Sequence, residues 1–254
     1  MRRLIIIASL LLVVSCNQGP NTFEQAIEQQ KQNNPAALSR IIKFAENGDY
    51  RAQLWLGRYY SQKEHKDQLK SATYFKLAAD QGDLDGMYFT GENHLSGEGL
   101  PRNEETSMSY LLAAANSNQL AAIVELSNIY RKKYEESWRV GQPSGSLWLA
   151  AISWNEKSFA FGYSPGAVWM QTLWANAPQS QGYTVRKVII QQAKWQHAYS
   201  LATGKYPNKE GDLFKLLNGK EKEEAQDLGV LAFGSYKTLK PAETYLNISK
   251  IYVY

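Results

Sequence analysis

Apolar and small residues in the middle of the chain recur at intervals of three and four, the spacing that places them on one stripe of a helix. The stripes are short, and turn residues such as Gly-Asp separate them. We expect paired helices, followed by one long amphipathic helix, at about 36–47, 50–61, 67–81, 84–96, 103–117, 119–133, 147–161, 165–176 and 184–204. The pattern therefore predicts an all-α protein.

The predicted helices belong to an internal repeat. The stretches "FAENGDYRAQLWLGRYY" and "LAADQGDLDGMYFTGENH" align at a shift of 34 residues, and a second shift of 36 relates Ala79 to Ala115. Small residues allow two helices to approach closely, so we expect helix contacts at Gly57, Ala79, Gly91 and Ala115. Gly82 is expected just after a helix C-terminus, and Asp67 and Asn103 as N-caps. Each unit would be a helix hairpin that its neighbours stabilise.

This pattern resembles the Sel-one-like repeat family, which is related to the tetratricopeptide repeats. The resemblance rests on "AQLWLGRYY", "DQLKSATYFKLAADQG" and "LSGEGLPRNEETSMSYLLAAANSN", and extends over about residues 37 to 175. It implies a right-handed superhelix of hairpins in which the first helix of each hairpin lines a concave groove. The third unit departs from the family pattern, with Ser127 in place of glycine and additional residues around "EESWRVGQPSGS", where we expect a loop.

The first residues have the order of a secretory signal. Arg2 and Arg3 precede an apolar run that ends at Ser15 and Cys16. The run is too short for a membrane-spanning helix, which needs ~20 residues, and a buried strand would not explain the flanking residues. "VVSC" resembles the bacterial lipobox, which implies cleavage before Cys16 and a diacylglyceryl thioether on its sulfur. By the same resemblance, Asn17 permits sorting to the outer membrane, facing the periplasm.

The chain therefore divides into four predicted parts. Residues 1–15 would be the signal peptide, 16–35 a lipidated polar tether with one helix from Thr22, and 36–203 the repeat superhelix. Residues 204–254 would form a C-terminal cap or tail. In this last part "NKEGDLFKLLNG" and "KEKEEAQDLGVLAFG" suggest two short helices, and "AETYLNISKIYVY" favours strand or extended structure.

Composition argues against several kinds of chemistry. Lipidation of Cys16, the only cysteine, excludes thiolate catalysis, disulfides and thiolate metal sites. Lys and Arg number 28 against 24 Asp and Glu, which is too balanced to suggest a nucleic-acid partner. His65, His94 and His197 lack metal-ligand spacing, and no serine lies in a nucleophile elbow. We therefore expect no enzyme activity, no cofactor and no metal.

One set of residues is a candidate binding surface. The fourth position of successive first helices holds Trp55, Phe89 and Trp169, and the seventh holds Arg58 and Glu92. These positions carry no packing signature, so their side chains are free to face the groove, where exposed aromatic residues often mark binding. The alternative is that they pack against the next unit.

These features favour a non-enzymatic, protein-binding lipoprotein that acts as a scaffold or regulator. Its partner would be a periplasmic or secreted protein. A second possibility is an immunity protein against a lipase-type toxin of the type VI secretion system, because repeat-bearing lipoproteins occur beside genes for such toxins. A third is a glycan- or peptidoglycan-binding module that uses the abundant Trp and Tyr side chains.

Overall fold

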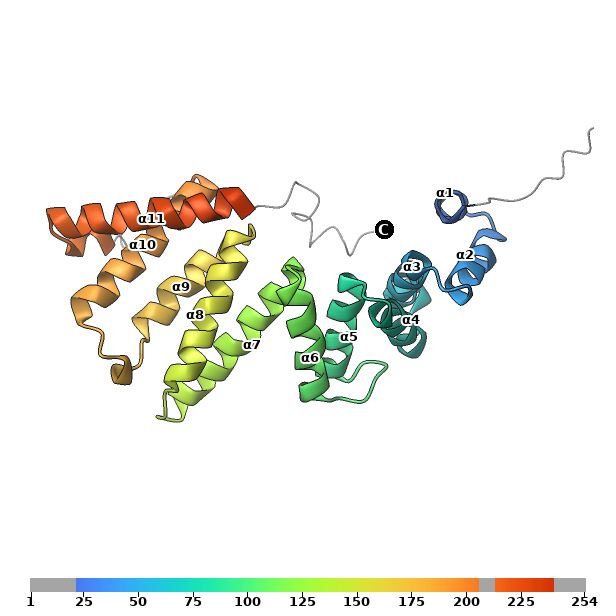
Figure 1. Ribbon diagram of the computed structural model, residues 1–254, viewed down its shortest axis with the longest axis horizontal. Coiled ribbons are helices and arrows are strands. Elements are labelled where there is room, and N and C mark those ends of the chain that lie inside the picture. The colour runs from blue at the N-terminus through green and yellow to red at the C-terminus, as the bar shows by residue number, and fades with distance from the viewer. Residues whose placement is uncertain (1–21, 206–212, 240–254) are drawn as a thin grey trace, which may run out of the picture.

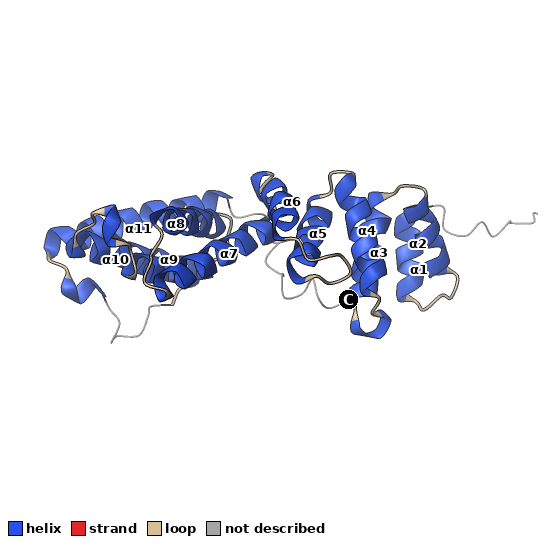
Figure 2. Ribbon diagram, turned by 90° about the horizontal axis from the view of Figure 1, so that it is seen from below, coloured by secondary structure: helices blue, strands red, loops and turns tan. Residues whose placement is uncertain are grey.

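A computed structural model describes residues 22–205 and 213–239, and this part of the chain is helical and contains no strand (Figures 1 and 2). The α-helices are α1 (Phe23–Lys31), α2 (Ala37–Glu46), α3 (Tyr50–Ser61), α4 (Gln68–Asp80), α5 (Leu84–Ser96), α6 (Glu104–Asn116), α7 (Leu120–Arg139), α8 (Gly145–Ala160), α9 (Pro165–Ala175), α10 (Val185–Thr203) and α11 (Gly219–Leu239). Short 3-10 turns lie at η1 (Lys63–His65), η2 (Gln179–Gln181) and η4 (Leu213–Leu216). The predicted all-α fold and its paired helices are confirmed.

The helix ends follow the capping residues that the sequence offers. The Asp67 side chain accepts a hydrogen bond from the Lys70 amide, and Asn103 does the same for Thr106, so both predicted N-caps are confirmed. Gly82 follows α4 with φ of +88°, a left-handed conformation that glycine adopts without steric cost.

The helices stack side by side in an extended row, and each packs mainly on the next one along the chain (Figure 1). The buried apolar residues accordingly form successive clusters. One centres on Ile41 and Leu56, another on Leu111 and Leu126, and a third on Trp148 and its neighbours. Each hairpin therefore depends on its neighbours for burial, as expected of a repeat array.

Two glycines lie where helices touch. A Cβ atom on Gly57 would come within 2.5 Å of Cδ1 of Phe75 on α4, and one on Gly91 within 2.8 Å of Cγ of Leu111 on α6. Ala79 and Ala115 are buried at related positions. A side chain larger than hydrogen at either glycine would push the two helices of a hairpin apart.

The structure corrects the expected loop after the third unit. The prediction that "EESWR" belongs to a loop is wrong, because α7 continues as one helix to Arg139. We call residues 134–139, which extend α7 beyond the expected helix, the added turns, and two contacts stabilise them. Tyr134 is buried at 1% exposure and donates a hydrogen bond to the Asn176 carbonyl oxygen, while Arg131 pairs with Glu135 one turn later, with 2.7 Å between nitrogen and oxygen.

The ends of the array also differ from expectation. The predicted helix from Thr22 is present as α1, and it packs on α2 through the fully buried Ala26, so residues 23–31 belong to the array rather than to a free tether. At the other end, α11 is a single 21-residue helix that packs on α10 and α8, where a shorter helix was expected. The other expected short helix is only the 3-10 turn η4.

Two further predictions concern regions outside the described residues. The lipidation site Cys16 with its signal sequence, and the extended segment "AETYLNISKIYVY", both lie there. Among the helices that the structure describes, none combines the length and apolar character that crossing a membrane requires.

Candidate functional site

The five predicted binding residues lie on the first helices of successive hairpins, Trp55 and Arg58 on α3, Phe89 and Glu92 on α5, and Trp169 on α9. We call α3, α5, α7 and α9 the odd-helix row. Side chains link neighbouring members of this row. The Arg58 guanidinium pairs with Asp85 of α5 at 2.7 Å, and Gln119, the N-cap of α7, donates to the other oxygen of that carboxylate at 3.0 Å.

Trp55 is half-buried on α3. Its indole stacks on the Tyr59 ring, with 5.2 Å between ring centroids, and Tyr59 in turn stacks on His65 at 4.1 Å. Trp55 also contacts the apolar cluster around Leu56. Much of the indole is therefore used within the protein, and only the part of the side chain that stays exposed can contact a partner.

Phe89 serves packing more than the binding prediction assumed. Its ring stacks on the buried Phe75 ring of α4 with centroids 4.3 Å apart, and the Arg58 guanidinium lies 5.7 Å from its centroid. Contacts of this kind hold α5 against α4. They leave less of the ring for a partner than the sequence pattern implied.

Glu92 lines a cavity of about 200 Å³ between α4, α5 and the connection from α3 to α4. Its Oε1 atom is buried and finds no hydrogen-bond partner among the described residues, and neither does Nδ2 of Asn93 beside it. Burial and, to a lesser degree, the Glu125 carboxylate on α7 raise the pKa of Glu92 to about 7, while Lys132 acts in the opposite direction. A group of this kind changes its charge near neutral pH.

Trp169 is covered by a cation from the neighbouring helix. The Arg131 guanidinium of α7 lies 4.0 Å from the centroid of the Trp169 ring and also pairs with Glu135. This arrangement ties α9 to the added turns of α7. The predicted Trp169 thus stands beside a part of the chain that the repeat pattern does not describe.

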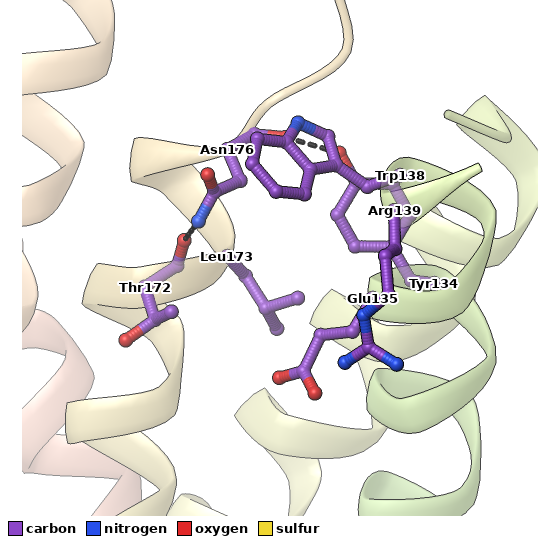
Figure 3. Close-up of a pocket in the computed structure, with 7 residues that line it drawn as sticks. All are labelled: Tyr134, Glu135, Trp138, Arg139, Thr172, Leu173 and Asn176. Carbon is purple, nitrogen blue, oxygen red and sulfur yellow. Dashed lines mark hydrogen bonds between the residues drawn. The ribbon is translucent and has the colours of Figure 1, made fainter. Parts of the chain in front are cut away.

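The added turns of α7 and the end of α9 enclose a pocket of about 260 Å³ (Figure 3). Leu173 and Tyr134 are buried and form its apolar base, while the Trp138 indole lies at its rim with 55% of its surface exposed. The other lining residues are Glu135, Arg139, Thr172 and Asn176. Two hydrogen bonds hold the base of the pocket in place. The Tyr134 hydroxyl donates to the Asn176 carbonyl oxygen, and Trp148 Nε1 donates to the Leu173 carbonyl oxygen at 2.8 Å.

The repeat pattern did not predict the residues that build this pocket from α7. A signal was present, since Tyr130, Tyr134 and Trp138 follow one another at intervals of four, the spacing of one helix face. The pocket also includes Thr172, the α9 residue at the seventh repeat position. The structure therefore places the candidate site at the α7–α9 end of the odd-helix row, next to Trp169, whereas Trp55 lies on α3, further along the row (Figure 1).

The histidines have local roles. His65 stacks on Tyr59, and Nδ1 of His94 lies 3.0 Å from the Pro101 carbonyl oxygen. Burial lowers the pKa of His197. Within residues 22–205 and 213–239, no three His, Cys, Asp or Glu side chains come together in a group that could hold a metal ion.

Comparison with known proteins identifies the repeats. Residues 51–83 and 84–119 match the model of the Sel1 repeat. The rat protein DAP3-binding cell death enhancer 1 is 34% identical over 86 residues, which are 34% of this chain and 17% of the rat protein. The chain therefore spans only a small part of that curated relative. Residues 51–119 are two Sel1 repeats, a class that generally mediates protein–protein interactions as a scaffold.

One solved structure supports the fold, and a second aligns more weakly. A Sel1 repeat protein from Oxalobacter formigenes aligns with a TM-score of 0.52 and 16% identity over 84% of this chain and all of that one. A protective antigen of uropathogenic Escherichia coli with an SLR fold aligns with a TM-score of 0.41 and 19% identity, over 82% of this chain and 52% of the antigen. The first likeness places the helical hairpins of this chain in the Sel1-repeat fold.

Proposed function

We propose that this protein is a lipid-anchored, non-enzymatic scaffold that binds another protein at the periplasmic face of a bacterial membrane. The observation that supports this function best is the pocket between α7 and α9, which opens beside Trp169 on the odd-helix row. The Sel1 repeats support the same conclusion, since such repeats generally bind proteins. The rat relative, whose name states that it binds DAP3, agrees with a protein partner.

The composition of the surface fits protein recognition. Trp, Tyr and Arg are the residues that most often dominate binding free energy at interfaces, and the pocket brings together Trp138, Tyr134 and Arg139. Tyr134 is held by its hydrogen bond to the Asn176 carbonyl oxygen, so the base of the pocket needs little further ordering on binding.

The anchor is proposed from the sequence alone. The charged, apolar and small residues that end at Cys16 suit a lipoprotein signal. Each acyl methylene that enters the bilayer contributes ~0.8 kcal/mol, so two or more chains would hold the protein firmly at the membrane. Asn17 suits the outer membrane by resemblance to enterobacterial sorting signals.

An affinity purification tests the function. The full-length chain, tagged after residue 254 and cross-linked in membranes of the native host, should retain one protein in stoichiometric amount. A variant of the same chain that carries both Trp55→Ala and Trp169→Ala should retain much less of that protein. Equal recovery of all proteins from the two samples would contradict protein binding through the odd-helix row.

The identity of the retained protein separates narrower versions of this function. A secreted lipase whose activity the purified chain abolishes would make the protein an immunity factor. An envelope protein would make it a scaffold or regulator. If the chain instead sediments with purified peptidoglycan and retains no protein, the glycan-binding alternative replaces the proposal.

A further inference from the structure

The charges around the α7–α9 pocket are unequal. Glu135 already forms an ion pair with Arg131, whose guanidinium lies over Trp169. Arg139 also lines the pocket, is exposed, and has no ion-pair partner among the described residues. The Arg139 guanidinium is therefore the one charge of the pocket lining without an opposite partner among the described residues, so the rim carries an excess of positive charge.

The interior of the pocket is apolar. Leu173 at 2% exposure and Tyr134 at 1% form the base, and the exposed Trp138 indole covers one side (Figure 3). The polar groups of Thr172 and Asn176 lie along the α9 wall, where the Asn176 amide nitrogen donates to the Thr172 carbonyl oxygen at 2.9 Å. An apolar side chain fits this base, because it would replace water that contacts Leu173 and Trp138.

We propose that the α7–α9 pocket anchors the protein partner through an apolar side chain followed directly by an Asp or Glu, whose carboxylate pairs with Arg139. This inference rests on the proposed protein-binding function and specifies the kind of segment that is bound. The apolar side chain lies on Leu173 between Tyr134 and Trp138. The guanidinium of Arg139 is planar and presents paired N–H donors that match a carboxylate.

Other occupants fit this pocket less well. A basic side chain would meet Arg139, while the one carboxylate of the lining, Glu135, is already paired with Arg131. The remaining exposed charges of the added turns, Lys132 and Glu136, do not line the pocket and offset each other. An uncharged apolar segment would leave Arg139 without a partner.

A peptide titration tests the pocket directly. The probe is the N-acetylated, C-amidated dipeptide of phenylalanine and glutamate, added to the full-length chain in detergent while the indole N–H resonance of Trp138 is followed by NMR. We expect saturable shifts, and about tenfold weaker binding when glutamate in the probe is replaced by glutamine or phenylalanine by alanine. Absence of saturable shifts, or equal binding of the glutamate and glutamine probes, would overturn the proposal.

Variants locate the contact. Arg139→Gln should weaken binding of the glutamate probe about tenfold but leave binding of the glutamine probe unchanged. Lys132→Gln on the same helix is the matched control and should bind both probes as the wild type does. If the two variants behave alike, the positive charge acts at long range and the proposed pairing is wrong. Both side chains are exposed, so folding should be retained, which the melting temperature verifies.

The partner experiment separates this inference from the function on which it rests. If the wild-type chain retains a partner and Trp138→Ala or Arg139→Gln retains it equally well, the function stands and the pocket proposal falls. If the wild type retains no protein, the function itself falls. If Trp138→Ala and Arg139→Gln each retain less of the partner while Lys132→Gln retains it normally, the result supports the function and the pocket proposal together.

Discussion

The indole of Trp55 stacks on the phenol ring of Tyr59 one turn later in α3, with ring centroids 5.2 Å apart and planes inclined by 16°. This pair gives Trp55 an intramolecular contact and leaves it half-buried. The side chain is thus neither a core residue nor a free one. Its contributions to stability and to binding can be separated by measuring both on one variant.

Trp55→Ala should weaken partner binding more than it lowers stability. A Trp anchor at an interface commonly costs ~2 kcal/mol or more on truncation, a loss of roughly 30-fold in affinity. The free energy of unfolding should fall less than the ~3–5 kcal/mol typical of a fully packed Trp, because Trp55 is only partly buried. Denaturant titration and binding to the purified partner measure the two quantities. A large loss of stability with intact binding would show that Trp55 is a structural residue.

Gly91→Leu should destabilise the protein by roughly 1–3 kcal/mol. Even a Cβ atom at Gly91 would come within 2.8 Å of Leu111, so the larger side chain forces α5 away from α6. Gly219→Leu is the matched control, since nothing lies within 4 Å of a Cβ built there. The melting temperatures of the two variants check this. Equal melting temperatures would show that the close approach at Gly91 carries no energetic weight.

Glu92→Gln should stabilise the protein at pH 8 but not at pH 4. The pKa of Glu92 is raised from 4.5 to about 7 by burial and by Glu125, so the folded state retains a proton that the unfolded state releases. Stability therefore falls as pH rises from about 4.5 to about 7, with a total effect on the order of 3 kcal/mol. Glutamine stays neutral and removes this loss.

Unfolding by urea at several pH values measures the difference between wild type and Glu92→Gln. Glu136→Gln on α7 serves as the control, because this exposed carboxylate lies outside the cavity and its removal leaves Glu92 in place. If the stability difference between wild type and Glu92→Gln does not change with pH, Glu92 has an ordinary pKa and the cavity around it is open to water.

Cys16→Ala should abolish lipid attachment and leave an uncleaved precursor. The sole cysteine ends the charged, apolar and small-residue signal, and its thiol is the expected acceptor. Labelling cells with palmitate and fractionating their membranes gives the result. Failure of the wild type to take up the label would refute the lipoprotein assignment, although the fold of residues 22–205 and 213–239 does not depend on it.

The sequence by itself determined the helices and their repetition. Apolar spacing of three and four, the N-caps Asp67 and Asn103, and Gly82 after α4 all act within a few residues of the chain, so they can be recognised without knowledge of distant neighbours. The same local rule should have extended α7, because Tyr134 and Trp138 continue its apolar stripe. The family pattern places a loop there, and the structure shows that the local spacing is the better guide.

Only the tertiary structure decided how the candidate binding residues are used. Arg131 covers Trp169 from another helix, Phe75 stacks on Phe89, and Tyr134 reaches Asn176, which lies 42 residues away in the chain. Exposure, pairing and pKa depend on such distant neighbours, and a repeat column contains no information about them. The α7–α9 pocket exists for the same reason, because its two walls are separated in sequence and meet only when the hairpins stack.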